Sequence, residues 1–357
     1  GVGAIIGDAL GPLPATLINW SYWISVWSAN AVLAQTAIRY MAVFEPRLAA
    51  SDQALAIWSV VLIWAMTLIN LRGPQAAGRF QLVTTTLRIL PLLAVIIIGA
   101  QLLGNSAASA PATAPKPFSG SEFTTVMAIA FYAMVGFETA GVAAERVRDP
   151  ARNVARATLI GVALTGLFYV AVCAAILLAL PAADVAASPA PIALFVERFW
   201  GETAAQLLAA FAIIAVVGCL NCWVLMQGEH PLSMARAGLL PPSLGVTNAR
   251  DVPVRVVLLA SVCASVLLLS SVSADGGLLT FMLNLTSAAS LIFYLGCCLA
   301  ALWLGLARGL ALVGLAFGLW ALYGSGQGAL LNFALMAAAL PLYWWARRGK
   351  TALPPSP

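Results

Sequence analysis

The sequence predicts an all-α polytopic membrane protein. Hydrophobic residues make up 62% of the 357-residue chain and charged residues only 9%, and the mean hydropathy is +0.96. Soluble domains carry about 25% charged residues, so this composition excludes an ordinary soluble domain. The apolar residues also form runs long enough to cross a bilayer, which takes about 20 helical residues.

About ten such runs follow one another along the chain, and the ninth is the shortest. No soluble domain interrupts them, so we expect one transmembrane domain over residues 1–357. The predicted spans are Pro12–Tyr40, Gln53–Leu71, Gln81–Leu103, Thr124–Ala144, Ala157–Leu180, Thr203–Gln227, Val254–Ser271, Leu278–Leu304, Leu310–Tyr323 and Ala329–Trp345.

The basic residues of the loops predict the orientation of these spans, because Lys and Arg accumulate in cytoplasmic loops. One side carries only Arg39, Arg47, Lys116 and Arg198. The other carries Arg72, Arg79, Arg146, Arg148, Arg152, Arg156, Arg236, Arg250, Arg255, Arg308, Arg347, Arg348 and Lys350. We therefore expect both ends of the chain in the cytoplasm. The formal charge of +5 reports this topology and does not indicate a nucleic-acid-binding patch.

Three connecting segments carry their own predictions. The Pro-, Ala- and Ser-rich stretch Asn105–Ser121 is typical of a flexible outer loop. The segment Ala187–Trp200 favours a short interfacial helix. The first residues, Gly1–Gly11, lack a signal peptide and an initiating Met and read as a loop, so we expect the sequence to begin partway into a longer protein.

The fourth span contains the strongest functional signal, AFYAMVGFETAG over Ala130–Gly141. Glu138 lies within an apolar segment, and a carboxylate in hydrocarbon is costly unless it faces a cavity or a partner. Gly136 weakens the helix at the same point, between Val135 and Phe137. Broken helices of this kind expose backbone groups to solutes in transporters. The alternative is a glycine kink with Glu138 tied to a neighbouring helix.

The first span places small and polar residues on one helical face by their i, i+3, i+4 spacing. Such a face suits either close helix packing or a solute cavity. Its members include Tyr22, Ser25, Val26, Asn30 and Leu33.

Other intramembrane residues are weaker candidates. Arg88 is permanently charged, so it is either a structural ion-pair partner, for example of Glu138, or a built-in cation at a site where other transporters bind a metal ion. Trp223 could bind a cationic group through its ring face or serve as an interfacial anchor. Thr286 and Tyr294 lie in the eighth span, while His230 is expected to be solvated in a cytoplasmic loop.

The sequence carries no signature of an enzyme. It lacks a nucleotide-binding loop and a nucleophile elbow, and we expect no cofactor and no bound metal. Six cysteines lie within apolar runs, which argues against a disulfide framework. Cys219 and Cys222 have CxxC spacing without a second pair, so we interpret them as packing residues.

Two segments carry a resemblance to a known family. They are YAMVGFETAGVAAERVRDPARNVARATLIG (Tyr132–Gly161) and ARAGLLPPSLGVTNARDVPV (Ala235–Val254). The combination of GFE, DPxRN and GLLPP resembles the amino acid–polyamine–organocation (APC) superfamily. Within it the chain is most similar to the basic amino acid/polyamine antiporters, such as the arginine–agmatine exchanger, from about Gly11 to Leu304.

This resemblance implies a LeuT-type fold, in which ten of twelve helices form two inverted five-helix repeats. The spans then correspond to helices three to twelve, and helices one and two are missing. Residues 12–104 would be the remainder of the first repeat, 122–304 the second repeat and 308–347 the last two helices. Because helix one supplies half of the family's substrate site, we expect no transport from these residues alone.

The resemblance also assigns roles to single residues. Tyr132 matches a gating tryptophan, Asn30 a polar residue that contacts the substrate side chain, and Arg88 a position near the ancestral sodium site, which implies sodium-independent transport. Tyr22 and Tyr294 match outer-gate or adjacent positions. The implied substrate-binding set is Tyr22, Ser25, Val26, Asn30, Leu33, Tyr132, Val135, Gly136, Glu138, Trp223 and Thr286.

The function these features predict is secondary-active amino acid transport in the bacterial inner membrane. The expected mode is exchange of an amino acid for a related amine or amino acid by alternating access, with a homodimer as an expected assembly. A cavity-facing Glu138 favours a cationic substrate, whereas a Glu138 occupied by Arg88 or by backbone donors favours a neutral one. The alternatives are a neutral amino acid permease or exporter of the same superfamily and a truncated, non-transporting membrane protein.

Overall fold

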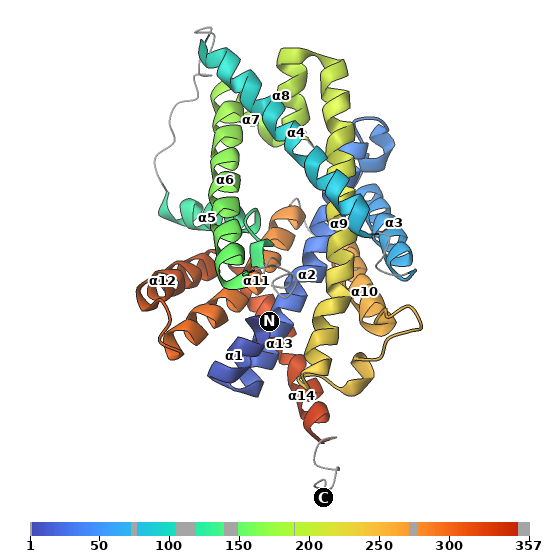
Figure 1. Cartoon of the computed structure of the whole chain (residues 1–357). Coiled ribbons are helices and arrows are strands. Elements are labelled where there is room, and N and C mark those ends of the chain that lie inside the picture. Colours follow the sequence, from blue (N-terminus) through green and yellow to red (C-terminus); the bar gives the residue numbers. More distant parts are fainter. Residues whose placement is uncertain are drawn as a thin grey trace, which may run out of the picture.

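A computed structural model describes residues 2–72, 77–104, 119–138, 149–188, 190–270 and 277–348 of the chain (Figure 1). These residues form helices joined by short turns. The α-helices are α1 (Val2–Leu10), α2 (Pro12–Met41), α3 (Asp52–Asn70), α4 (Ala77–Gly104), α5 (Gly120–Tyr132), α6 (Pro150–Ala179), α7 (Ala182–Ala187), α8 (Pro191–Trp200), α9 (Glu202–Arg236), α10 (Val254–Ser270), α11 (Leu278–Trp303), α12 (Arg308–Gly324), α13 (Gln327–Ala337) and α14 (Ala339–Arg348).

Helix α2 is the central element of the fold, and it contacts α9, α11, α3, α10, α1 and α13. It begins after Gly11, whose φ of 88° turns the chain, and Pro12 stands in its first turn. Its side chains are buried along most of its length, tryptophans and hydroxyl-bearing residues included. Polar side chains inside a membrane protein need hydrogen-bond partners, so we expect the neighbouring helices to supply partners for the buried polar side chains of α2.

Three hydrophobic clusters of described residues hold the helices together, one of them shared by α1, α2 and α11. The largest joins α2 to α9, α10 and α11 through Trp23, Val224, Leu268 and Leu285, among others. The second lies between α4, α6, α8 and α9 and includes Phe195 of α8, which is fully buried. Helix α9 contributes to both clusters and runs alongside α2 in Figure 1.

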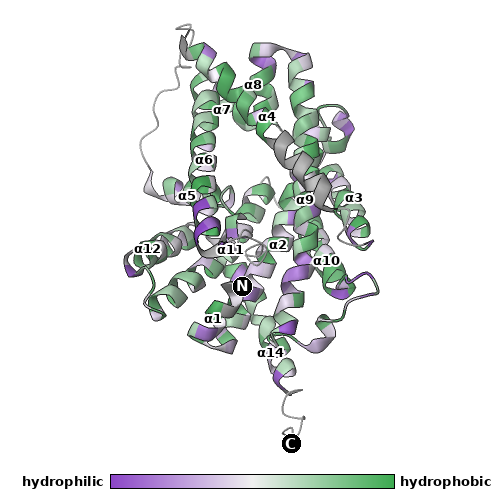
Figure 2. Ribbon diagram, in the orientation of Figure 1, coloured by the Kyte–Doolittle hydropathy of each residue, from purple (hydrophilic) through white to green (hydrophobic). Residues whose placement is uncertain are grey.

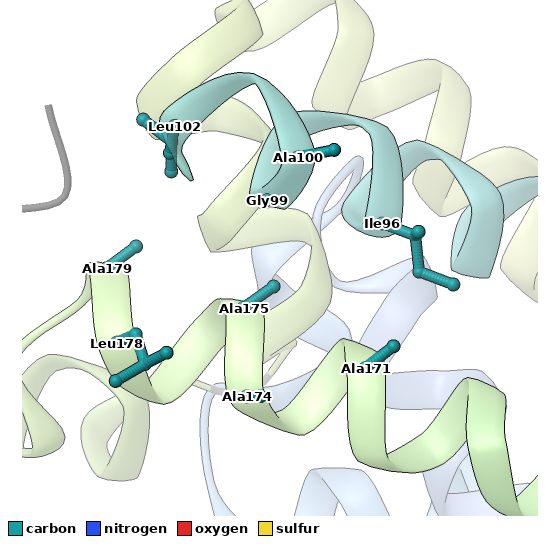
Figure 3. Close-up of a pocket in the computed structure, with 9 residues that line it drawn as sticks. All are labelled: Ile96, Gly99, Ala100, Leu102, Ala171, Ala174, Ala175, Leu178 and Ala179. Atoms are coloured by element: carbon teal, nitrogen blue, oxygen red, sulfur yellow. The ribbon is translucent and has the colours of Figure 1, made fainter. Parts of the chain in front are cut away.

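Helices α4 and α6 meet through small residues. A Cβ atom added to Gly99 of α4 would lie 2.8 Å from the Cβ of Ala175 in α6, so the two backbones approach closely there. Figure 3 shows Ala171 and Ala175 of α6 pointing toward α4 across a cavity of about 260 Å³. In the orientation predicted from the basic residues, the contact between Gly99 and Ala175 lies toward the side of the membrane away from the cytoplasm.

Among the described residues, five helical segments are long and apolar enough to cross a membrane, by length and composition: 52–70, 152–179, 202–236, 278–303 and 327–347. Shorter apolar helices cover 89–102, 254–270 and 308–324. Figure 2 shows hydrophobic colour over most of α6 and α12 and hydrophilic colour at loops and helix ends. The architecture is therefore that of an all-α, multi-pass membrane protein, as the composition predicts.

Two predicted elements are corrected by the structure. Residues 2–10 form α1, which packs on α2 and α11, where a loop was expected. The last span is divided into α13 and α14 at Ala338. The short helix predicted within Ala187–Trp200 is present as α8, which follows the six-residue α7 and packs against α4 and α9; its position at a membrane interface stays a prediction.

The fourth span is described only up to Glu138. Its helix, α5, begins at the Ser119 cap, whose hydroxyl accepts the Glu122 backbone N–H, and ends at Tyr132, just before the predicted interruption. The remainder of the predicted span, beyond Glu138, lies outside the described residues.

Candidate functional site

The predicted interruption of the fourth span is confirmed. After Tyr132 the backbone closes three successive i→i−3 hydrogen bonds, from Ala133 to Ala130, from Met134 to Phe131 and from Val135 to Tyr132. Gly136 then adopts a φ of +117°. L-residues rarely adopt this region, so glycine is the residue that lets the chain leave the helix here.

Glu138 lies directly after this turn and accepts hydrogen bonds from three donors. The Tyr22 hydroxyl of α2 donates to Oε1 at 2.6 Å, and the Tyr294 hydroxyl of α11 donates to Oε2. The Gly136 backbone N–H also donates to Oε2, at 2.9 Å. Hydrogen bonds to a carboxylate are about twice as strong as those between neutral groups. We name Tyr22, Gly136, Glu138 and Tyr294 the carboxylate latch, since they tie the broken helix to α2 and α11.

Aromatic rings enclose the latch. The ring of Phe293 lies 4.6 Å from that of Tyr22, and Phe137 stacks on Tyr294 at 5.2 Å. Phe131 meets Tyr294 edge-on, with ring centroids 5.5 Å apart. The rings cover part of Glu138, which remains half-buried.

Two further features adjoin the break. Trp223 of α9 approaches Gly136 so closely that an added Cβ would lie 3.4 Å from its Cζ2. On the side of α6, a cavity of about 360 Å³ lies against the break. Its lining includes Val135 and Phe137 from the break and Thr158, Gly161, Thr165 and Tyr169 from α6. Both cavity and tryptophan thus flank the same turn of irregular backbone.

The structure brings only part of the predicted substrate-binding set to this place. Tyr22, Val135, Gly136, Glu138 and Trp223 meet at the break, and Tyr294 joins them. Tyr132 is half-buried and packs against the large cluster around α2.

The other predicted residues of α2 lie elsewhere along the helix. Ser25 donates to the carbonyl of Tyr22 in its own helix, and Val26 is fully buried in the cluster shared by α1, α2 and α11. Leu33 packs against the largest cluster. Thr286 of α11 shares a 2.8 Å hydrogen bond with Ser28. These residues make packing and hydrogen-bond contacts within or between helices, and their described hydrogen bonds do not reach the carboxylate of the latch.

Asn30 belongs to a different polar cluster, centred on Gln227 of α9. The fully buried Gln227 accepts from the Asn30 amide at 2.7 Å and donates to Ser261 of α10 at 2.9 Å. Ser261 in turn shares a 2.7 Å bond with Thr67 of α3. We name Asn30, Thr67, Gln227 and Ser261 the amide hub, because they join α2, α3, α9 and α10.

The hub was not predicted from the sequence, although one signal points to it. Pro231 lies inside α9 and has no N–H, so the carbonyl of Gln227, four residues earlier, has no partner in the helix. The indole N–H of Trp23 donates to that carbonyl at 2.8 Å. A proline within an apolar span therefore marks a backbone acceptor that another helix must satisfy.

The prediction for His230 was wrong. It lies within α9, half-buried, and not in a solvated loop. Its Nε2 lies 3.0 Å from the carbonyl oxygen of Asn19, and its ring meets Tyr22 edge-on at 4.9 Å. A carbonyl only accepts hydrogen bonds, so Nε2 carries the proton in this contact. His230 thus supports the turn of α2 that presents Tyr22 to Glu138.

Arg88 stands in α4, and its side chain lies outside the described residues. The predicted ion pair between Arg88 and Glu138 therefore stays a prediction. The described contacts of Glu138 are with hydroxyl and backbone donors.

Fold and site together define a multi-pass membrane protein in which a helix ends in an irregular turn beside a half-buried carboxylate. The family model for the amino acid permeases matches residues 1–348. The chain therefore belongs to the amino acid permease family, within the APC superfamily.

The similar proteins include two antiporters and one transporter of amino acids or amines. The cadaverine/lysine antiporter of Escherichia coli K12 is 27% identical, over 72% of this chain and 58% of that protein. The arginine/ornithine antiporter of Pseudomonas aeruginosa is 28% identical, over 93% and 73%. The putrescine transporter PotE of Haemophilus influenzae is 23% identical, over 71% and 58%. The matched region of this chain thus spans less than two thirds of the first and the third relative.

Proposed function

We propose that this chain forms the transmembrane domain of a secondary-active antiporter that exchanges a basic amino acid for a related amine or amino acid. The observation that carries the proposal is the carboxylate latch, which lies where α5 ends and the chain turns toward Glu138. It combines an irregular turn of backbone with a charged group held by two other helices.

In this proposal the latch is a gate. Tyr22 and Tyr294 hold Glu138 through one hydroxyl each, so the break separates from α2 and α11 when two side-chain bonds open. Rocking of the helices around the break against those around α2 then gives alternating access. The carbonyl groups at the C-terminal end of α5 and in the turn at 133–136 bind the amino group of the substrate, assisted by the negative end of the α5 helix dipole, while its carboxylate is bound at the other helix break that the resemblance implies.

The orientation predicted by the basic residues assigns a side to this gate. Tyr22 lies ten residues from Pro12, the end of α2 expected in the cytoplasm. The latch would accordingly close the cytoplasmic side of the site, where the resemblance implied an outer gate for Tyr22 and Tyr294. Tyr132 and Trp223 remain the aromatic candidates for covering the substrate.

The wider arrangement follows the resemblance. Residues 12–104 and 122–304 would belong to the two inverted repeats of a LeuT-type fold, followed by two further helices in 308–347. We propose a bacterial inner-membrane location with both ends of this chain in the cytoplasm, and a homodimer as the assembly. Arg88, as a fixed cation near the ancestral sodium site, would make exchange independent of sodium.

The substrate class rests on the relatives, whose names specify lysine, arginine, ornithine and diamines. A second candidate is a neutral amino acid permease or exporter. The observation that favours it is that both oxygens of Glu138 already accept hydrogen bonds. In that case the carboxylate would have no oxygen directed at a cationic side chain.

The test is counterflow in proteoliposomes, using the protein expressed from its complete native reading frame. Vesicles loaded with lysine, ornithine, cadaverine or leucine would be diluted into each labelled solute, with sodium replaced by choline in a parallel series. We expect exchange among the cationic solutes, unchanged in choline. Exchange of leucine alone would support the permease, and no exchange of any solute would support a non-transporting protein.

A further inference from the structure

The outward-facing side of α6 combines two exposed arginines with an apolar stripe. Arg152 and Arg156, one turn apart, are both exposed at the start of this membrane helix. Positions separated by three or four residues share a helix face, and the same face continues upward through exposed apolar residues. We name this surface the basic–apolar face; its members are Arg152, Arg156, Leu159, Ala163, Leu167 and Val170.

The apolar part of this face is markedly exposed. Leu159, Leu167 and Val170 retain 71%, 67% and 69% of their accessible surface. The opposite side of α6 carries Thr158, Gly161, Thr165 and Tyr169, which line the cavity at the helix break. Figure 2 shows the change from hydrophilic colour at the lower end of α6 to hydrophobic colour above it. The two sides of α6 therefore face different surroundings.

Within the described part of the chain, the two arginines of this face have no anionic partner. Neither Arg152 nor Arg156 forms an ion pair with a described carboxylate, including Asp149, the residue before the helix. Like charges four residues apart on a helix repel each other. The first turn of a helix also carries partial positive charge, so an anion close to both guanidinium groups would relieve this repulsion.

We propose that the basic–apolar face binds an anionic phospholipid of the cytoplasmic leaflet. The phosphodiester accepts hydrogen bonds from both guanidinium groups, which match phosphate oxygens in a bidentate manner. The acyl chains lie along Leu159, Leu167 and Val170. From Leu159 to Val170 the apolar part of the face rises about 17 Å, close to the roughly 15 Å of one hydrocarbon leaflet. The acyl chains of a lipid anchored at the arginines thus cover most of the apolar part of the face.

The position of this lipid gives it a route to the candidate site. It would press on the side of α6 opposite the cavity at Val135 and Phe137, and so fix how α6 stands beside the break. Binding of the lipid does not depend on the proposed transport activity, so the two can be tested separately.

The binding test is native mass spectrometry of the purified protein titrated with palmitoyl-oleoyl phosphatidylglycerol or with the matching phosphatidylcholine. We expect tighter retention of phosphatidylglycerol. Each arginine near an anionic surface contributes about fivefold in affinity, so Arg152→Gln with Arg156→Gln should weaken it about 25-fold. Arg152→Lys with Arg156→Lys keeps the charge and should keep most of the preference.

The matched control is Arg250→Gln with Arg308→Gln, which removes the same charge from two other exposed arginines of the predicted cytoplasmic side. It should change the affinity less than twofold. An equal loss in both pairs, or no preference for phosphatidylglycerol, would overturn the proposal. A photoactivatable phosphatidylglycerol should label residues 152–170. Labelling confined to other parts of the chain would equally overturn the proposal.

Discussion

The carboxylate latch and the amide hub are both buried polar clusters on α2, yet they are built differently. The latch depends on one half-buried carboxylate beside a helix break and on two tyrosine hydroxyls. The hub depends on a fully buried neutral amide within continuous helices, and its bonds extend to a third and a fourth helix. One cluster therefore meets irregular backbone, while the other meets only regular helices.

This difference predicts that the latch can open during transport, whereas the hub keeps its helices together. A carboxylate with hydroxyl partners can exchange them for water, because carboxylate and hydroxyls alike are well solvated. The Gln227 amide of the hub is fully buried and cannot exchange its partners for water, and leaving a buried amide unpaired costs about 1–3 kcal/mol. We therefore expect changes at the hub to alter stability and changes at the latch to alter the transport cycle.

The largest effect is expected at the hub, from Gln227→Leu. The substitution removes the acceptor of the Asn30 amide and leaves that buried amide without a described partner. The free energy of unfolding should fall by about 2 kcal/mol, measured by thermal denaturation in detergent. Gln206→Leu is the control, because Gln206 donates to Glu202 of its own helix at the surface and should change stability little.

A second variant sharpens this prediction. Asn30→Leu combined with Gln227→Leu removes both partners, and replacing both by apolar groups costs less than orphaning one. The double variant should be less destabilised than the sum of the two single variants. Simple additivity would show that the two amides are not coupled, contrary to the hub.

The next effect is expected at the break, from Gly136→Ala. Alanine at a φ of +117° is strained, and its Cβ would also touch Trp223 at 3.4 Å. A cost of about 1–2 kcal/mol in stability is expected, measured by the same denaturation. Gly166→Ala is the matched control, since nothing lies within 4 Å of its added Cβ. Within a helix this change should be neutral or stabilising by up to about 1 kcal/mol, and equal losses at both glycines would contradict a special role for the break.

The smallest effect on stability is expected from Tyr22→Phe and Tyr294→Phe. Each removes one hydroxyl from Glu138 while keeping the ring and its aromatic neighbours. Because water can replace the hydroxyl, stability should fall by no more than about 1 kcal/mol, while exchange should slow about fivefold to tenfold. Tyr343→Phe, whose hydroxyl contacts Arg347 in α14, should leave exchange unchanged.

The fold could be predicted from the sequence because spans and their order depend on local composition. Runs of apolar residues identify helices wherever they are long enough, and they gave the correct place for α2, α3, α9 and α11. They failed at α1, where a short helix is stabilised by packing on its neighbours α2 and α11. Short segments carry too few residues for periodicity or length to decide.

The site could be predicted only in part. Glu138 and Gly136 stand out locally, since an acid and a glycine within one apolar run are conspicuous. The partner of Asn30 could not be predicted, because Gln227 lies 197 residues further along the chain. His230 was misplaced because a charged residue, a histidine and a proline directly after the predicted span suggest a loop. Its actual contact, the Asn19 carbonyl, comes from another helix.

The most direct test of the central claim is the kinetics of Glu138→Gln for several substrates. If Glu138 is a latch, the variant should lower the maximal exchange rate about tenfold. The factor should be the same for lysine, ornithine and cadaverine, and KM should change little. The amide keeps one acceptor but presents an NH₂ group where donors converge. A rise in KM confined to cationic solutes, with an unchanged rate for a neutral one, would instead make Glu138 a substrate ligand and contradict the latch.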